Sequence, residues 1–281
     1  MKRIMTVQDI SCVGKCSLTV ALPIISAAGV EAGVLPTAVL STHTMFKKYT
    51  FCDLTDEITP IVDTYKELEI DFDAIYTGYL GSHRQLSLVE KFIKDFKKED
   101  TVVLIDPVMA DNGVFYKGFD ENFAVSMKNL CKSADIIIPN LTEASFMLGI
   151  QYNPDYDEDY IKDILKKLTD IGCKTAALSG ISFSEDKIGV YAYNKESGSY
   201  FSYFNEKLPA SFHGTGDIFA SSVLGALMRG LSTEKSLKIA VDYTLECMKK
   251  TLADEHHRFY GVNFEEALPF YIESINKALS E

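Results

Sequence analysis

The sequence contains no run of 18 uncharged apolar residues, the length that a membrane-spanning helix needs. The nearest approach, Leu18–Val30, contains Pro23 and is followed by Glu31, so we interpret it as a buried helix. The first residues, Met1–Met5, run directly into a strand-like segment without a cleavage pattern, and we expect no signal peptide. We therefore predict a protein that does not act in a membrane.

Cysteines are also scarce, because six in 281 residues are too few for a disulfide scaffold. Cys12 and Cys16 are separated by three residues, not by the two of a redox or zinc motif. No second Cys or His pair follows at metal-ligand spacing. We expect free thiols in a reducing, cytoplasmic environment.

Basic residues are outnumbered, with 28 Lys and Arg against 40 Asp and Glu and a formal net charge of −12. Nucleic acids and anionic membranes both attract basic surfaces, so we expect neither as a partner. An anionic substrate stays open, because a local pocket can oppose the net charge and Mg²⁺ neutralises much of a nucleotide's phosphate charge.

No Pro/Gly/Ser linker, internal repeat or low-complexity segment divides the chain, and we predict a single domain over residues 1–281. Apolar runs alternate with amphipathic segments, which predicts an α/β fold with a mostly parallel central sheet and helices on both faces. The predicted strands are Arg3–Val7, Val34–Leu40, Ala74–Thr77, Val102–Ile105, Ile136–Pro139, Thr175–Leu178 and Ile188–Tyr193. The predicted helices between them are Cys16–Ala28, Asp53–Leu68, Ser87–Phe96, Asp120–Ser133, Glu143–Leu148 and Tyr160–Ile171.

The pattern changes after Gly180. Lys187–Asn194 and Ser199–Asn205 predict a small β-hairpin, because they flank a polar turn that ends in glycine. From Gly216 onward the sequence is almost wholly helical, with predicted helices at Asp217–Met228, Thr233–Ala253 and Phe264–Leu279.

The strongest chemical signal is the run His213-Gly214-Thr215-Gly216-Asp217, which stands between the hairpin and a helix rich in small residues. Glycines before a helix free backbone N–H groups to converge on an anion, and the helix dipole adds to the attraction. A carboxylate in the first turn can then take a proton from a hydroxyl that attacks a phosphate. The alternative is that Asp217 only caps the helix while the glycines make a turn. The place of the run, after the sheet and a hairpin, favours the catalytic interpretation.

Two further polar segments follow predicted strands. Asp106–Gly113 comes directly after Val102–Ile105, and Asn140–Glu143 comes after Ile136–Pro139. Open α/β sheets bind ligands at the carboxyl ends of their strands, so both segments bring oxygen ligands suited to Mg²⁺ to one edge. The alternatives are a simple turn at Asp111–Gly113 and a helix cap at Asn140–Glu143.

These motifs resemble the ribokinase-like superfamily and, within it, the vitamin B6 (pyridoxal) kinase branch, over nearly the whole chain. The Gly-Thr-Gly-Asp run resembles the motif of the superfamily. The Walker motif Gly-x-x-x-x-Gly-Lys is missing here, and the superfamily also lacks it. The branch resemblance rests on Val7-Gln8, Ser41-Thr42-His43-Thr44, Thr77-Gly78-Tyr79, Asp106-Pro107-Val108-Met109, Asp111-Asn112-Gly113 with Tyr116, and Asn140-Leu141-Thr142-Glu143.

The resemblance implies an ATP- and Mg²⁺-dependent kinase that phosphorylates the 5′-hydroxymethyl group of pyridoxal, pyridoxine or pyridoxamine. It also implies a monovalent cation (K⁺ or Na⁺) beside the anion hole, a homodimer, and a nucleotide flanked by the hairpin. By resemblance, Asp217 is the base and Gly214, Thr215 and Gly216 form the anion hole. The resemblance further implies that Asn140, Ser179 and Asp106 contact the nucleotide. It implies that Glu143, Asp106 and Thr142 bind magnesium. The residues that it implies for substrate binding are Gln8, Asp9, Thr44, Tyr79 and Asp217.

Two departures from the branch concern the substrate pocket. Asp9-Ile10 stand where Ser-His is common, and Met45 replaces the common glycine after His-Thr. We hypothesise that Asp9 accepts a hydrogen bond from a donor group of the substrate. The alternative is that Asp9 turns away and caps the loop Ser11–Ser17.

Three other functions compete with a vitamin B6 kinase. A hydroxymethylpyrimidine kinase of thiamine synthesis often carries Cys-Gly-Thr-Gly-Cys and an N-terminal Gly-Gly-Ala-Gly, and neither occurs here. A sugar kinase typically has an N-terminal Gly-Gly segment, which is also missing. A binding or regulatory protein without turnover is the third, and the intact Asp217 speaks against it.

Overall fold

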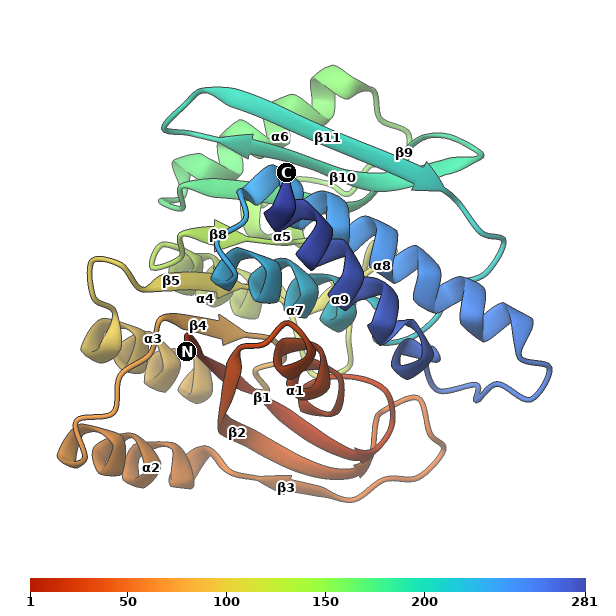
Figure 1. Cartoon of the computed structure of the whole chain (residues 1–281). Coiled ribbons are helices and arrows are strands. Elements are labelled where there is room, and N and C mark those ends of the chain that lie inside the picture. The colour runs from red at the N-terminus through yellow and green to blue at the C-terminus, as the bar shows by residue number, and fades with distance from the viewer.

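The computed structural model describes residues 1–281 and contains a nine-stranded sheet in the order β11-β10-β9-β8-β5-β4-β1-β2-β3 (Figure 1). Strands from β2 through β1, β4, β5 and β8 to β9 run parallel, so the predicted mostly parallel sheet is confirmed. The strands are β1 (Arg3–Val13), β2 (Glu31–Thr42), β3 (Phe51–Asp53), β4 (Ala74–Thr77), β5 (Val102–Ile105), β8 (Ile136–Ile137), β9 (Thr175–Ser184), β10 (Lys187–Asn194) and β11 (Ser199–Glu206).

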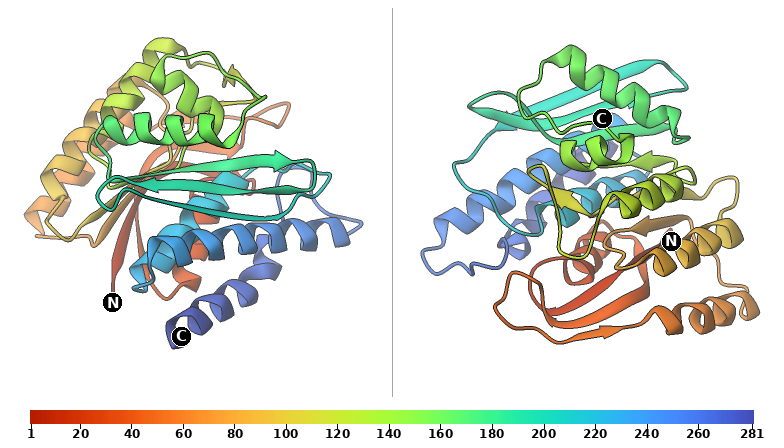
Figure 2. Two further views of the ribbon diagram at one scale, coloured as in Figure 1. Left: turned by 90° about the horizontal axis from the view of Figure 1, so that it is seen from above. Right: turned by 180° about the vertical axis from the view of Figure 1, so that it is seen from behind.

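Helices cover both faces of the sheet, as predicted (Figure 2). One buried apolar cluster joins the sheet to α2 (Thr55–Glu67), α3 (His83–Phe96), α4 (Glu121–Cys131), α5 (Leu141–Leu148) and α6 (Glu158–Asp170). The other joins the opposite face to α1 (Leu18–Ala27), α7 (Thr215–Met228), α8 (Thr233–Ala253) and α9 (Phe264–Ser280). Even α8, with 21 residues, is not long and apolar enough to cross a bilayer, and neither is any other helix.

The structure differs from the predicted elements mainly at the start of the chain. β1 continues past Val7 to Val13, with a bulge between Gln8 and Ile10, because it keeps pairing with β2. Helix α1 begins at Leu18, not Cys16, since Ser17 has non-helical backbone angles. β3 was not predicted, because its three exposed residues become a strand only by pairing with β2.

Two hairpins complete the fold. The predicted hairpin forms as β10 and β11, and it extends the main sheet because β10 also pairs antiparallel with β9. A separate pair, β6 (Ala110–Asp111) and β7 (Val114–Phe115), is joined by Asn112 and Gly113 at φ of 49° and 77°. Positive φ at both central residues is typical of a tight type I′ turn. The turn predicted as the alternative at Asp111–Gly113 is therefore confirmed.

Candidate active site

The glycine-rich loop, which we define as His213–Gly216, leads into helix α7 at the edge of the sheet where the parallel strands end. Gly214 has a φ of 83°, and a Cβ at this position would lie 2.0 Å from the carbonyl oxygen of Lys15. Only glycine fits such a position, because both its backbone angle and its neighbour exclude a side chain. The first N–H groups of α7 lack intrahelical acceptors and lie at the positive end of the helix dipole. Gly214, Thr215 and Gly216 thus lie at the helix N-terminus, where the sequence predicts an anion hole.

Asp217 lies in the first turn of α7 and is half-buried. Its Oδ2 accepts a hydrogen bond of 2.9 Å from the backbone N–H of Ser17, while no side chain or backbone N–H donates to Oδ1. Burial raises the pKa of Asp217 to about 7; the Ser17 hydrogen bond opposes this shift and the charge of Asp9 adds to it. A carboxylate that ionises near neutral pH, with one free oxygen, is suited to accept a proton.

Two further carboxylates, those of Asp106 and Glu143, are buried near the end of β5. Oδ2 of Asp106, which follows β5, is 4.0 Å from the position that a Cβ on Gly216 would occupy. Burial raises the pKa of Asp106 well above its usual value, and the charges of Glu143 and Asp217 raise it further. Burial also raises the pKa of Glu143. None of the three carboxylates forms an ion pair with a lysine, arginine or histidine.

A capping box fixes Glu143 at the start of α5. The Asn140 side chain accepts from the Glu143 N–H at 2.9 Å, and Oε2 of Glu143 accepts from the Asn140 N–H at 2.9 Å. The other oxygen, Oε1, accepts from the N–H of Met109 at 3.1 Å. The helix cap predicted as an alternative here is confirmed, and the same bonds hold the carboxylate beside the end of β5.

The remaining nucleotide and metal candidates lie close to this cap. Asn140 also donates to the carbonyl oxygen of Ala110 at 2.8 Å and forms a parallel bridge with Ser179, which is partly exposed. The Thr142 hydroxyl is buried and accepts from the Gly113 N–H at 3.0 Å. No three His, Cys, Asp or Glu side chains converge to hold a metal directly. A metal at this edge would therefore need water or phosphate oxygens as most of its ligands.

Apart from Asp217, the four predicted substrate residues have very different surroundings. Gln8 is fully buried against Gly78, and neither of its amide atoms has a hydrogen-bond partner. Asp9 is 5% exposed, and its two oxygens accept from the hydroxyls of Ser17 and Ser11. Tyr79 is partly exposed and packs on Phe119, while Thr44 lies exposed in the turn after β2. Only Asp9 is connected to Asp217, through Ser17.

Two residues at this edge, Ser17 and His43, were not among the predicted site residues. Ser17 contacts the carboxylates of both Asp9 and Asp217. His43 is buried, and its Nδ1 accepts from the Met45 N–H at 3.2 Å, so its Nε2 carries the proton that it donates to the Tyr260 carbonyl at 3.0 Å. Its ring lies 4.4 Å from that of His213. His43 thereby joins the Thr44 turn to the segment that precedes the glycine-rich loop.

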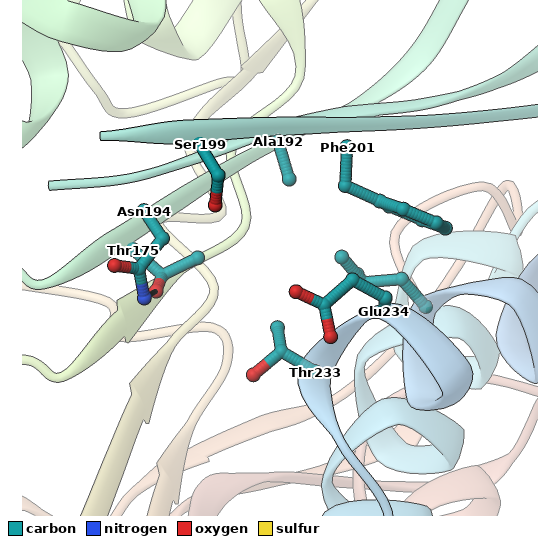
Figure 3. A pocket seen from close by; sticks show the side chains of 8 residues that line it. Thr175, Ala192, Asn194, Ser199, Phe201, Thr233 and Glu234 are labelled. Carbon is teal, nitrogen blue, oxygen red and sulfur yellow. Dashed lines mark hydrogen bonds between the residues drawn. The ribbon is translucent and has the colours of Figure 1, made fainter. Parts of the chain in front are cut away.

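A small hollow lies between the β10–β11 hairpin and the start of α8 (Figure 3). Thr175, the first residue of β9, and Thr233, the first residue of α8, both line it. It therefore lies at the opposite edge of the sheet from Asp217, and none of the predicted site residues lines it.

The chain is similar to known proteins over nearly its whole length. The family described as phosphomethylpyrimidine kinase matches residues 23–261. Pyridoxal kinase from Dictyostelium discoideum is 24% identical over 304 residues, covering 99% of this chain and 98% of the relative. The crystal structure of pyridoxal kinase from Lactobacillus plantarum has a TM-score of 0.91 at 28% identity, covering 99% and 98% of the two chains. A Bacteroides thetaiotaomicron protein, provisionally named phosphomethylpyrimidine kinase and crystallised with pyridoxal, has a TM-score of 0.92 at 40% identity, covering 96% and 95%.

Proposed function

The chain belongs to the phosphomethylpyrimidine kinase family, and we propose that it transfers the γ-phosphoryl group of ATP to the 5′-hydroxymethyl group of pyridoxal, pyridoxine or pyridoxamine. The observation that carries the proposal is the half-buried Asp217 beside the glycine-rich loop, with one carboxylate oxygen free of protein donors. The names of relatives that match the full length, with the pyridoxal complex of a 40% identical protein, support the vitamin B6 substrate.

The proposed reaction is a direct transfer. Asp217 takes the proton of the substrate hydroxyl, whose oxygen forms a bond to the γ-phosphorus while the bond to the β–γ bridging oxygen breaks. ADP leaves with that oxygen, and the N–H groups of Gly214, Thr215 and Gly216 stabilise the phosphoryl charge. Catalysis then consists of positioning and electrostatics, without a covalent enzyme intermediate.

We propose Mg²⁺ as the metal, held near Asp106, Glu143 and Thr142 with the nucleotide beside Asn140 and Ser179. The fit rests on two carboxylates whose pKa is raised by burial, with the charge of Glu143 raising that of Asp106 further, and which have no cationic partner. When bound, Mg²⁺ would neutralise phosphate charge. The monovalent cation beside the anion hole and the nucleotide contact of the β10–β11 hairpin are proposed from the family resemblance alone.

Glu143→Gln should raise the Mg²⁺ concentration needed for half-maximal rate, because an amide attracts a hydrated cation less than a carboxylate does. Binding of pyridoxal in the absence of nucleotide should stay nearly unchanged. Steady-state rates across a Mg²⁺ titration measure the first effect, and calorimetry measures the second. Glu234→Gln, in the first turn of α8, is the matched control. An unchanged Mg²⁺ titration for Glu143→Gln would remove this residue from the metal site.

A coupled assay of ADP release tests the substrate. Pyridoxal, pyridoxamine, pyridoxine, hydroxymethylpyrimidine and ribose should be compared at equal concentrations, and the three B6 vitamers should give the highest kcat/KM. A preference for hydroxymethylpyrimidine would mean that the protein is a pyrimidine kinase, in line with the name of the family, and not a vitamin B6 kinase. No ADP release with any of the five compounds would favour a binding protein that keeps the fold.

We propose that the protein forms a homodimer through the edge of the sheet at β3. This edge strand leaves backbone groups unpaired, and three large apolar side chains around it, those of Met45, Tyr49 and Phe51, are 53%, 38% and 50% exposed. Exposed apolar edges of this kind are usually covered by a partner. Light scattering should give about twice the chain mass of 31.3 kDa, and Phe51→Glu should halve it. A monomer at all concentrations would contradict the proposal.

A further inference from the structure

Ser17 has a backbone conformation that residues other than glycine rarely adopt. It lies directly before α1 with φ of 51° and ψ of −135°, and it is 7% exposed. A serine in this place normally caps its helix through the hydroxyl, yet no such bond forms. Unfavourable backbone angles persist only where the surroundings hold them, and they cluster at functional sites.

The side chain of Asp9 holds Ser17 in this conformation. Oδ1 of Asp9 accepts from the Ser17 hydroxyl at 2.6 Å, and Oδ2 accepts from the Ser11 hydroxyl at 3.1 Å. Asp9 itself is anchored in the sheet, at the bulge of β1 between Gln8 and Ile10. Its two oxygens therefore bind one hydroxyl in the same strand, that of Ser11, and one directly before α1, that of Ser17.

The backbone of Ser17 contacts a second carboxylate, that of Asp217. The Ser17 N–H donates to Oδ2 of Asp217 at 2.9 Å, so one side of that carboxylate is fixed. Two residues earlier, the carbonyl of Lys15 lies against Gly214, where it leaves no room for a Cβ. The loop between β1 and α1 therefore contacts both the base and the glycine-rich loop.

We propose that Asp9 and Ser17 are positioning residues for the base: Asp9 holds the Ser17 hydroxyl, and the Ser17 amide orients Asp217. Since Asp217 is the base only in the proposed function, this role depends on that function. With Oδ2 taken by the amide, Oδ1 is left to accept the proton of the substrate hydroxyl. In this arrangement Asp9 acts through Ser17 on the rate of transfer and does not read the substrate ring.

The test compares Ser17→Ala, Asp9→Ala, the double variant and Asp9→Asn in the ADP-release assay. Each Ala variant should lower kcat by about 10- to 100-fold, since misplacing a catalytic group by an ångström has effects of this order. KM for pyridoxal and ATP should change by less than about twofold. The double variant should be no slower than the slower single variant, because both changes break one connection. Asp9→Asn keeps an oxygen acceptor for the Ser17 hydroxyl and should recover most of the rate.

Three results would overturn the proposal. A raised KM for pyridoxal with unchanged kcat in Asp9→Ala would mean that Asp9 reads the substrate. Losses that multiply in the double variant would mean that the two residues act separately. Crystal structures of Asp9→Ala with the Ser17 φ and its bond to Asp217 unchanged would show that Asp9 does not hold the loop.

The structural measurement needs no substrate, so it separates this proposal from the proposed function. If wild-type protein phosphorylates none of the compounds, the function fails, and the structures still decide whether Asp9 holds Ser17. Ser232→Ala is the control, because it removes one serine hydroxyl that caps α8 at the opposite edge of the sheet. It should lower the melting temperature without changing kcat.

Discussion

Asp217→Asn is expected to lower kcat by about 10²–10⁴-fold while leaving the dissociation constants of pyridoxal and ATP nearly unchanged. The amide keeps the shape of the side chain and an oxygen that can accept from the Ser17 N–H, but it cannot take a proton at neutral pH. Rates should be measured where chemistry limits turnover, with binding measured separately by calorimetry. A kcat within about threefold of wild type would mean that Asp217 only caps α7.

Stability provides the control that the loss of rate is not a loss of fold. Burial raises the pKa of Asp217 to about 7 in the folded protein, against 3.8 as the ordinary value. The folded protein therefore binds an extra proton between these values, and stability falls as the pH rises from about 4 to about 7. Asn carries no charge, so Asp217→Asn should be at least as stable as wild type at pH 8. Asp157→Asn, which changes a carboxylate that caps α6, should leave kcat unchanged.

The parallel part of the fold could be predicted from the sequence because burial on both faces leaves a direct pattern. β5 is a continuous apolar run, β4 is apolar except for Thr77, and the predicted ends of both agree with the structure residue for residue. The end of β1 carries no such pattern, since Gln8–Val13 mixes polar and apolar side chains. Its strand conformation comes from pairing with β2, a long-range contact that a local pattern cannot contain.

The edge that holds the candidate site could be predicted for a similar reason. Asp106, Glu143 and Asp217 each stand where a strand ends or a helix begins, and the topology of a parallel sheet brings such places together. The role of Ser17 could not be predicted, because a serine before a helix normally indicates a cap. Its hydroxyl binds Asp9 instead, and that contact depends on the bulge in β1 and the path of the loop.

The sequence motifs also could not predict the surroundings of the residues that we expect to contact the substrate ring. Gln8 directly follows the part of β1 that was predicted, but its side chain is fully buried against Gly78. Thr44 lies exposed in its turn, while the histidine before it is buried and bonded to Tyr260 near the far end of the chain. Which side chain of such a turn faces inward depends on packing by the segment between α8 and α9, which contains Tyr260 and is more than two hundred residues away. The ring contacts of Gln8, Thr44 and Tyr79 stay predictions.

Gly214→Ala is the second change with a large expected effect, because it acts on two parts of the site together. The methyl group would lie 2.0 Å from the carbonyl oxygen of Lys15, so the glycine-rich loop or the loop that leads to Ser17 must move. Movement of the first loop would misplace the N–H groups that we propose as donors for the phosphoryl group, and movement of the second would disturb the amide that binds Asp217. Losing one such donor typically costs about 10²–10³ in kcat, and we expect at least this loss, together with weaker ATP binding.

Gly230→Ala separates this effect from the general cost of a side chain at positive φ. Gly230 follows the same helix, α7, with φ of 90°, and a Cβ there would have no neighbour within 4 Å. Both variants should lose about 1–2 kcal/mol of unfolding free energy from the left-handed backbone, with Gly214→Ala losing more because of the overlap with Lys15. Only Gly214→Ala should lose activity per folded molecule, measured as kcat after correction for the folded fraction. Equal kcat in the two variants would mean that the glycine-rich loop tolerates displacement, and that its N–H groups do not hold the phosphoryl group during transfer.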